Sequence, residues 1–276
     1  MSYIPLSNSK SSPEERELKK KLIELADLEL ELADRELELA TFQAELREFE
    51  DRYLRIVGWR YAKLDEIRAQ IAEAEARLKP DNKQAKQEAD HSRKRAEESS
   101  REAESLEELP AKAKFKPSDE LKKLYREIAR QVHPDLASND ADRERRNGFM
   151  TEVNRAYEKG DIARLEELQQ EWKRNPETVK DEGIGAELVR VIRKIAKVED
   201  RLVAIDEEIE AHSDSELQQL RNRVEEAEDE GRDLLQEMAD DLDREITEAK
   251  AEGYEVMRRL VRKLDDDWLF SELEIV

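Results

Sequence analysis

The sequence predicts an all-α protein in which long coiled-coil helices flank a small helical hairpin. Charged residues make up 44% of the 276 residues and aromatic residues only 5%, which leaves too few β-branched and aromatic side chains for a large sheet protein. Proline, which interrupts helices, is absent from residues 14–79 and from residues 177–276. Apolar residues recur in steps of three and four through both stretches, so both are expected to be long helices.

The first long helix is expected over residues 13–79, after a flexible segment of residues 1–12. Its start carries a capping box, because Ser12 precedes Pro13 and Glu15 lies three residues after the serine. Large side chains then repeat every seven residues and form a coiled-coil seam. The seam consists of Leu25, Leu32, Leu39, Leu46 and Tyr53, with Leu28, Phe42, Phe49 and Ile56 between them.

Aromatic residues interrupt this regular pattern around Gly58, at Tyr53, Trp59 and Tyr61. One interpretation is a wider packing layer where another helix joins the bundle. The other is a docking surface for a second protein, since aromatic residues are enriched at interfaces. The packing layer is the favoured interpretation.

Residues 80–110 are predicted to form a polar helical linker whose only apolar spine is a row of alanines. Pro80, Asp81 and Asn82 form a turn signal that would let this helix fold back on the first one. A solvated, charged linker helix is the alternative. The alanines of the spine are Ala85, Ala89, Ala96 and Ala103.

The C-terminal coiled-coil helices are expected over residues 175–264. Asn175 and Pro176 read as an N-cap and first helical residue, and a second capping box from Ser213 to Glu216 indicates a break near residue 212. The apolar seam continues on both sides of that break. It includes Leu188, Val191, Ile195, Val198, Leu202, Ile205, Ile209, Leu217, Leu220, Val224, Leu235, Met238, Leu242, Ile246, Ala249, Val256, Leu260 and Leu264.

An acidic and aromatic tail follows at residues 265–276. Trp268, Leu269 and Phe270 come directly after three aspartates. This segment is interpreted as a last helical turn that tucks its aromatic side chains into the bundle, with a short docking peptide as the alternative. The long helices need partners for their apolar seams, so they pair either within the chain or between two chains of a homodimer.

The central residues 111–174 differ from the flanks, because residues 111–172 hold thirteen basic and thirteen acidic side chains in a chain of net charge −21. A helix over about 118–131 has an apolar face and a compact basic face, and a second helix over about 142–158 follows a loop. Gly160 and Asp161 then end that helix and cap a short third one. The predicted apolar core comprises Leu121, Leu124, Tyr125, Ile128, Phe149, Val153, Ala156 and Tyr157; the basic face comprises Lys122, Lys123, Arg126 and Arg130.

The string LKKLYREIARQVHPD, followed by FMTEVNRAYEKGD, resembles the J-domain of DnaJ-type co-chaperones. In that family a basic helix leads into an HPD loop, and the next helix carries an F…AYE pattern. The resemblance covers about a fifth of the chain. The family's short first helix, with its tyrosine pair and L-G-[VI] motif, has no counterpart in the preceding LEELPAKAKFKPSDE; Leu109 or Phe115 would have to fill its place.

The resemblance implies a partner and a site. J-domains bind DnaK-type heat-shock ATPases of about seventy kilodaltons, where the basic helix meets an acidic groove and the HPD loop triggers ATP hydrolysis. Opposite charges of this kind steer encounter and fix register. The resemblance assigns the trigger to His133, Pro134 and Asp135, and the docking patch to Lys122, Lys123, Arg126 and Arg130. An unidentified client would be held by the coiled coil.

Other classes of function are not expected. The acidic charge argues against nucleic-acid binding, and no P-loop, G-x-S-x-G or H-E-x-x-H motif indicates an enzyme. We therefore expect no catalytic residues and no cofactor. The chain has no cysteine, and its scattered His91, His133 and His212 do not predict a metal site. It has no apolar signal or membrane-spanning run, which favours a cytoplasmic protein that does not bind membranes.

Two hypotheses about function follow. In the first, the protein is a co-chaperone adaptor whose hairpin recruits a DnaK-type ATPase while the coiled coil selects a client or complex. In the second, it is a structural coiled-coil scaffold whose degenerate J-like module does not stimulate an ATPase. The intact HPD sequence and basic face favour the first, and the missing first helix favours the second.

Overall fold

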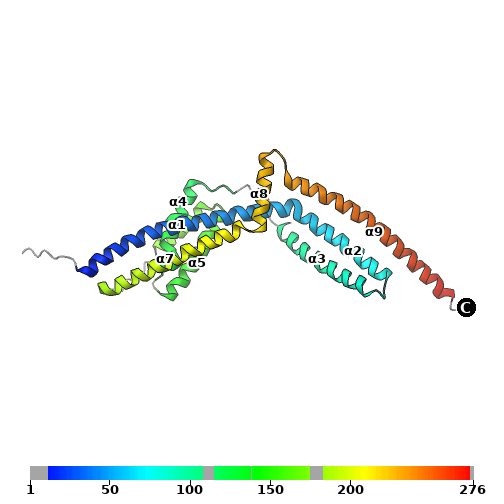
Figure 1. The fold of residues 1–276 in the computed structure, drawn as a ribbon, viewed down its shortest axis with the longest axis horizontal. Coiled ribbons are helices and arrows are strands. Elements are labelled where there is room, and N and C mark those ends of the chain that lie inside the picture. Colours follow the sequence, from blue (N-terminus) through cyan, green and yellow to red (C-terminus); the bar gives the residue numbers. More distant parts are fainter. Residues whose placement is uncertain (1–11, 108–114, 138, 175–182, 274–276) are drawn as a thin grey trace, which may run out of the picture. The chain divides into compact units, whose positions relative to one another are not determined.

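The structure is a computed structural model that describes residues 12–107, 115–137, 139–174 and 183–273 (Figure 1). All regular secondary structure within these ranges is helical, which confirms the predicted all-α class. The chain divides into two compact units. Unit 1 comprises Met1–Glu45 with Lys114–Ser215, and unit 2 comprises Leu46–Ala113 with Glu216–Val276.

The N-terminal helix begins where the sequence predicts. The Ser12 backbone N–H donates to Glu15 Oε2 at 2.9 Å, and Ser12 Oγ accepts the Glu15 N–H at 3.2 Å, so the capping box is confirmed. Helix α1 (Pro13–Tyr53) passes into a π-helical turn, η1 (Leu54–Gly58), and continues as α2 (Trp59–Leu78). The sequence predicted this stretch as a single regular helix and did not indicate the π turn.

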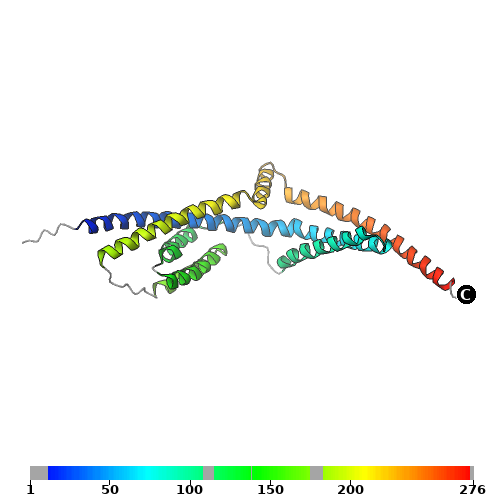
Figure 2. The ribbon, with the colours of Figure 1, turned by 60° about the horizontal axis from the view of Figure 1, so that its bottom comes forward.

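Unit 1 is built on a parallel pair of helices, α1 and α7 (Ile184–Ser213). Glu36 contacts Arg201 and Gln43 contacts His212, so residue numbers rise together along the two helices. Figures 1 and 2 both show α1 (blue) and α7 (yellow-green) side by side. The seam between them therefore closes within one chain, through Leu18, Leu25, Leu32, Leu39, Val191, Ile195, Val198 and Ile205.

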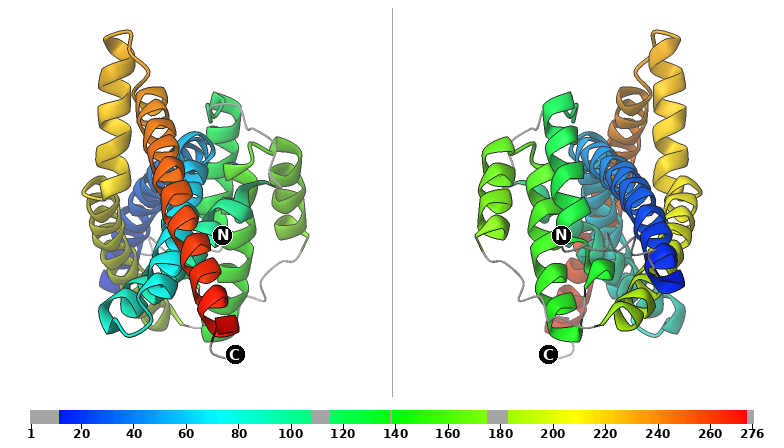
Figure 3. Two further views of the ribbon diagram at one scale, coloured as in Figure 1. Left: turned by 90° about the vertical axis from the view of Figure 1, so that its right-hand side faces the viewer. Right: turned by 90° about the vertical axis from the view of Figure 1, so that its left-hand side faces the viewer.

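The rest of unit 1 is a small helical module formed by α4 (Asp119–Val132), η2 (Pro134–Leu136), α5 (Asp140–Glu158) and α6 (Ile162–Lys173). Figure 3 shows α4 and α5 (green) beside α1 (blue). Gly160 has φ +67°, and the Asp161 N–H donates to the Ala156 carbonyl at 2.9 Å, which ends α5 in a left-handed C-cap as predicted. Asp161 Oδ1 then accepts the Arg164 N–H and caps α6.

Unit 2 is organised around α2. Helix α3 (Lys83–Glu107) returns antiparallel along α2 (Figure 2): Arg93 contacts Glu66, and Ser99, later in α3, contacts Asp65, which is earlier in α2. Of the two alternatives for the polar helix, the structure has the one that folds back, with Ala89 and Ala96 buried. Asn82 caps α3, since its Oδ1 accepts the Gln84 N–H at 2.9 Å.

Helix α9 (Leu234–Leu273) lies parallel to α2 in unit 2. Arg60 forms an ion pair with Asp243 at 3.1 Å, and Glu75, later in α2, forms one with Arg259, later in α9, at 3.9 Å. The predicted break near residue 212 separates α7 from α8 (Glu216–Asp229). A second break, at Gly231 with φ +78°, separates α8 from α9 and was not predicted. The core of unit 2 comprises Phe49, Val57, Leu64, Val224, Leu235, Leu242, Ile246 and Ala249.

Of the three aromatic residues near Gly58, one packs against a core and two are exposed. Tyr53 packs against the core of unit 2, as the packing-layer interpretation predicts. Trp59 and Tyr61 are exposed, and the Arg60 guanidinium lies 4.4 Å from the Trp59 ring centroid. A Cβ at Gly58 would lie 2.8 Å from Leu54 Cδ2, so a larger residue there would require the end of the Leu54 side chain to shift.

Helix α9 reaches Leu273, so most of the predicted tail has a helical backbone. The side chains of Trp268, Leu269 and Phe270 lie outside the described part of the structure, as do residues 175–182 with the predicted Asn175-Pro176 cap. Within the described residues, no helix combines the length and apolar character needed to cross a membrane.

Candidate functional site

Helix α4 separates its apolar and basic side chains as the sequence predicts. Ser118 Oγ accepts the Leu121 N–H at 3.1 Å, which satisfies a free amide at the helix start. Leu121, Tyr125 and Ile128 are buried, and Leu124 is partly buried. On the opposite face Lys122 is partly exposed, whereas Lys123, Arg126 and Arg130 are exposed.

Helix α5 supplies the facing half of the module's core. Val153, Ala156 and Tyr157 are buried as predicted. Phe149 is only partly buried, and its ring lies 5.1 Å from the Trp172 ring of α6. Met150, which the sequence analysis overlooked, is buried in this core.

A third wall of the module comes from α1. Ala33, Leu37 and Ala40 are buried against α4 and α5, and their spacing of four and three residues places them on one face. Small side chains at two of these positions let the helices approach closely. Phe115 also fills part of the expected gap, since its ring lies 5.7 Å from Tyr157 in an edge-to-face arrangement. Leu109 lies outside the described residues.

Two tyrosine hydroxyls tie the module to α1 by hydrogen bonds. Thr41 Oγ1 and the Tyr157 hydroxyl are 2.7 Å apart, and the Thr41 hydroxyl also donates to the Leu37 carbonyl. The Tyr125 hydroxyl lies 3.5 Å from the Glu36 carbonyl of α1 and also donates to Asn154 Oδ1 of α5 at 2.9 Å. Because Tyr125 is fully buried, desolvation raises the pKa of its phenol well above the usual value, so it stays a hydrogen-bond donor.

His133 ends α4 and lies buried, with only 3% of its surface exposed. Its Nδ1 accepts the Asp135 backbone N–H at 3.2 Å. In the neutral ring the proton must then be on Nε2, which is 2.9 Å from Glu36 Oε1 and donates to it. The imidazole therefore links the loop to α1 and at the same time shapes the loop.

Glu36 joins the loop to α7 as well as to α1. Its Oε1 accepts a second hydrogen bond from Arg201 Nε at 2.8 Å, and Arg201 Nη1 contacts Glu208 at 2.6 Å. Burial acts to raise the pKa of the Glu36 carboxyl, but the hydrogen bonds and charges of His133 and Arg201 outweigh it, so the pKa falls below its ordinary 4.5. A buried carboxylate with these partners stays ionised at neutral pH.

The lowered pKa of Glu36 predicts a pH dependence of stability. Because the pKa of Glu36 is lower in the folded than in the unfolded protein, its ionised form stabilises the folded state at pH values above 4.5, the ordinary pKa. This stabilisation is lost as the pH falls through the pKa of the folded state. Wild type should therefore exceed Glu36→Gln in unfolding free energy at about pH 7, and the difference should shrink towards about pH 3. Urea unfolding of both proteins measures this; a pH-independent difference would contradict it.

Asp135, Pro134 and Leu136 complete the loop. Pro134 and Asp135 are half-buried, and Arg143 Nη2 lies 3.4 Å from Asp135 Oδ1. Leu136 is buried in the seam between α1 and α7. A pocket of about 310 Å³ opens beside the loop, lined in part by Glu36, Asp135 and Arg201.

Arg146 of α5 holds the loop from the other side. Its Nε lies 2.9 Å from Asp142 Oδ2, and its Nη1 donates to the Gln131 carbonyl at 2.8 Å and to the His133 carbonyl at 3.5 Å. The guanidinium also stacks 5.1 Å from the Trp172 ring centroid. This buried side chain satisfies the Gln131 carbonyl at the end of α4 and adds a second donor to the His133 carbonyl, which also accepts the Leu136 N–H at 3.1 Å.

Part of the basic face of α4 is turned towards acidic residues of α1. Arg126 Nε is 2.6 Å from Asp34 Oδ1. Nearby, partial burial raises the pKa of Glu29, and the positive charge of Arg130 opposes that rise. The four basic residues are thus brought to one helix face, but Arg126 is already paired within the chain.

The sequence analysis missed Glu36, Arg201 and Arg146. A second apolar stripe on the first helix, at Ala33, Leu37 and Ala40, could have indicated that this helix packs on two neighbours, with Glu36 between the two packed faces. No comparable local signal marks Arg201 or Arg146.

Within the described residues, no group of three or more acidic or histidine side chains is arranged to hold a metal ion. Searches against protein-family models, curated proteins and solved structures returned no match to this chain.

Proposed function

We propose that this protein is a J-domain co-chaperone or adaptor that recruits a DnaK-type heat-shock ATPase and stimulates its ATP hydrolysis. The observation that carries the proposal is the end of α4, where a helix with one basic face leads directly into a His-Pro-Asp loop of defined shape. In this proposal His133, Pro134 and Asp135 act on the ATPase, while Lys122, Lys123, Arg126 and Arg130 provide electrostatic docking.

The packing of α1 on the module supports the proposal, because α1 covers the apolar core that the missing first helix would otherwise cover. Ala33, Leu37 and Ala40 cover the apolar faces of α4 and α5. A J-like module that lacks its own first helix can therefore still bury its core. In return, the module is tied to the coiled coil, which in our proposal selects the client or complex and works in the cytoplasm.

The buried contact of His133 with Glu36 adds a requirement. A loop that acts on another protein must be accessible, yet His133 is 3% exposed. We infer that the loop separates from Glu36 and Arg201 before it engages the ATPase. The same burial favours a second candidate function, a coiled-coil scaffold in which the J-like module only packs against α1 and α7.

Steady-state ATP turnover by a DnaK-type chaperone distinguishes the two functions. Wild type should stimulate turnover, and Glu36→Ala should increase the stimulation severalfold because it removes the carboxylate that holds His133. His133→Gln should abolish stimulation in both backgrounds. Glu31→Ala is the matched control, since Glu31 is an exposed glutamate of the same helix, and should behave as wild type.

Folding of each variant is checked by circular dichroism and thermal unfolding, because Glu36→Ala removes the acceptor of the buried His133 and the half-buried Arg201. Arg201→Ala is a second variant expected to loosen the loop, because it removes the hydrogen bond between α7 and Glu36. We call Glu36→Ala and Arg201→Ala the release variants. If neither wild type nor either folded release variant stimulates turnover, the co-chaperone proposal is wrong and the scaffold function stands.

A further inference from the structure

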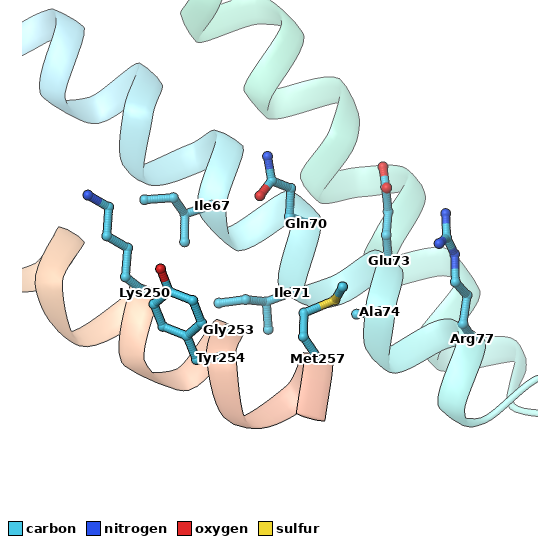
Figure 4. A pocket seen from close by; sticks show the side chains of 10 residues that line it. All are labelled: Ile67, Gln70, Ile71, Glu73, Ala74, Arg77, Lys250, Gly253, Tyr254 and Met257. Atoms are coloured by element: carbon cyan, nitrogen blue, oxygen red, sulfur yellow. The ribbon is translucent and has the colours of Figure 1, made fainter. Parts of the chain in front are cut away.

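Apolar surface stays open in both units. In unit 2 a groove of about 530 Å³ lies between α2 and α9, with Ile67 and Ile71 on one side and Tyr254 and Met257 on the other (Figure 4). Both acidic and basic side chains line this groove, so its charges do not select one class of partner. The open surface of unit 1 lies on α1 beside the basic face of α4, and its charges do select one.

The open surface of α1 continues the row of residues on which the module packs. Ala33, Leu37 and Ala40 follow one another in steps of four and three and are buried against α4 and α5. Leu30 comes three residues before Ala33, and Ile23 comes seven residues before Leu30, both on the same face of the helix. Leu30 is 48% exposed and Ile23 is 58% exposed, so the module covers only part of an apolar row.

The exposed part of this row begins where the basic face of α4 meets α1. Arg126 Nε lies 2.6 Å from Asp34 Oδ1, and Arg130 is close enough to Glu29 for its charge to act on that carboxyl. Leu30 directly follows Glu29 and comes one turn before Asp34. Its exposed side chain therefore lies along α1 between the two points that the arginines reach. A protein that binds the basic face of α4 comes next to Leu30 as well.

The other end of the exposed row is basic too. Further steps of four and three from Ile23 towards the N-terminus lead to Lys19 and Arg16, which are both exposed. The whole row is Arg16, Lys19, Ile23, Ala26, Leu30, Ala33, Leu37 and Ala40. It contains no acidic residue, although the chain has a net charge of −21. Its exposed apolar residues thus lie between basic side chains at both ends, which is complementary to a protein surface whose apolar centre has acidic borders.

We propose that the partner bound by the basic face of α4 also covers the exposed row of α1, with apolar side chains on Ile23 and Leu30 and carboxylates near Arg16 and Lys19. This inference rests on the proposed function, in which that partner is the DnaK-type ATPase. Ile23 and Leu30 are about 10 Å apart along the helix, so one partner surface reaches both. A second copy of this chain matches poorly, because a two-fold contact between two such rows would place basic ends opposite basic ends.

ATP turnover by a DnaK-type chaperone, measured against the concentration of the full chain, tests the inference. Combining Ile23→Asp with Leu30→Asp should raise the concentration for half-maximal stimulation by about tenfold, because two apolar contacts become charges that repel the acidic borders. The maximal turnover should stay as in wild type, since the loop after α4 is unchanged. Val189→Asp with Val203→Asp is the matched control. These valines are 48% and 59% exposed on α7, and Val203 is about 200° around that helix from Arg201, so the control changes a face away from the loop.

A second pair of substitutions tests the charges at the end of the row. Arg16→Glu with Lys19→Glu should raise the same half-maximal concentration severalfold, because both side chains would then repel a carboxylate of the partner. Both positions are exposed, so these substitutions remove no buried contact. Circular dichroism and thermal unfolding check that every double variant is folded.

The outcomes separate this inference from the proposed function. If wild type stimulates turnover and neither α1 pair changes the half-maximal concentration, the inference is wrong while the proposed function stands. If neither wild type nor either release variant stimulates turnover, both are wrong. Sedimentation equilibrium adds a further outcome: a wild-type dimer that Ile23→Asp with Leu30→Asp dissociates would assign the row to a second copy and overturn the inference.

Discussion

Replacing Arg146 with alanine is expected to lower the unfolding free energy of unit 1 by about 3–5 kcal/mol, the range for breaking a buried ion pair by removing one partner. The variant leaves buried Asp142 without the Arg146 charge and leaves the Gln131 and His133 carbonyls without that donor. It also removes the cation stacked on Trp172. Urea unfolding followed by circular dichroism measures the change.

Arg155→Ala is the matched control for this prediction. Arg155 lies on the same helix but is exposed, so its loss should change the unfolding free energy by no more than about 0.5 kcal/mol. If both variants change stability equally, Arg146 does not organise the end of α4 as described.

Replacing Leu37 with alanine is expected to destabilise unit 1 by about 2–5 kcal/mol, as for other buried leucines that leave a cavity. Leu37 lies on α1, more than eighty residues before α4, yet its side chain is part of the core formed by Tyr125, Val153 and Tyr157. Near-UV circular dichroism reports on those tyrosines. It should lose signal along with stability if the core loosens.

Leu30→Ala separates this effect from a general weakening of α1. Leu30 is on the same helix but is 48% exposed, so its substitution removes little buried surface. The variant should leave the near-UV signal unchanged and cost much less than Leu37→Ala. Equal effects of the two substitutions would contradict the role of α1 as a wall of the module.

Local features of the fold could be predicted from the sequence because they depend on neighbouring residues. The capping box at Ser12, the left-handed cap at Gly160 and the two faces of α4 each follow from a few residues in a row. The buried core of the module was predicted in the same way, except that Leu124 and Phe149 are only partly buried and Met150 is buried without having been predicted.

The remaining features depend on which distant segments of the chain contact each other. A local sequence pattern does not determine those contacts. A seam of leucines predicts a partner but not whether that partner runs parallel, and α1 pairs in parallel with α7 only because long intervening segments return the chain. The contact between His133 and Glu36 joins residues 97 positions apart. The π turn at η1 was missed because it replaces one regular turn in an otherwise unbroken helix, whereas the break between α8 and α9 depends on the positive φ of a single residue, Gly231.

The site therefore combines a loop that the sequence predicted with contacts to Glu36 that it did not predict. His133 shapes the loop through Nδ1 and attaches it to α1 through Nε2, so one side chain couples the module to the coiled coil. A change in the α1 and α7 pair that moves Glu36 or Arg201 would free the loop. In the proposed co-chaperone, events at the coiled coil could thus control access of the ATPase to His133, Pro134 and Asp135.

Hydrogen–deuterium exchange of residues 132–137 tests the central claim, that Glu36 holds the His133 loop against the coiled coil. The amides of His133, Leu136 and Ala137 donate hydrogen bonds within the module, so they should exchange slowly in wild type. Glu36→Ala should accelerate exchange of this segment, while Glu31→Ala should not. Rapid exchange in wild type, or equal protection in wild type and folded Glu36→Ala, would contradict the claim.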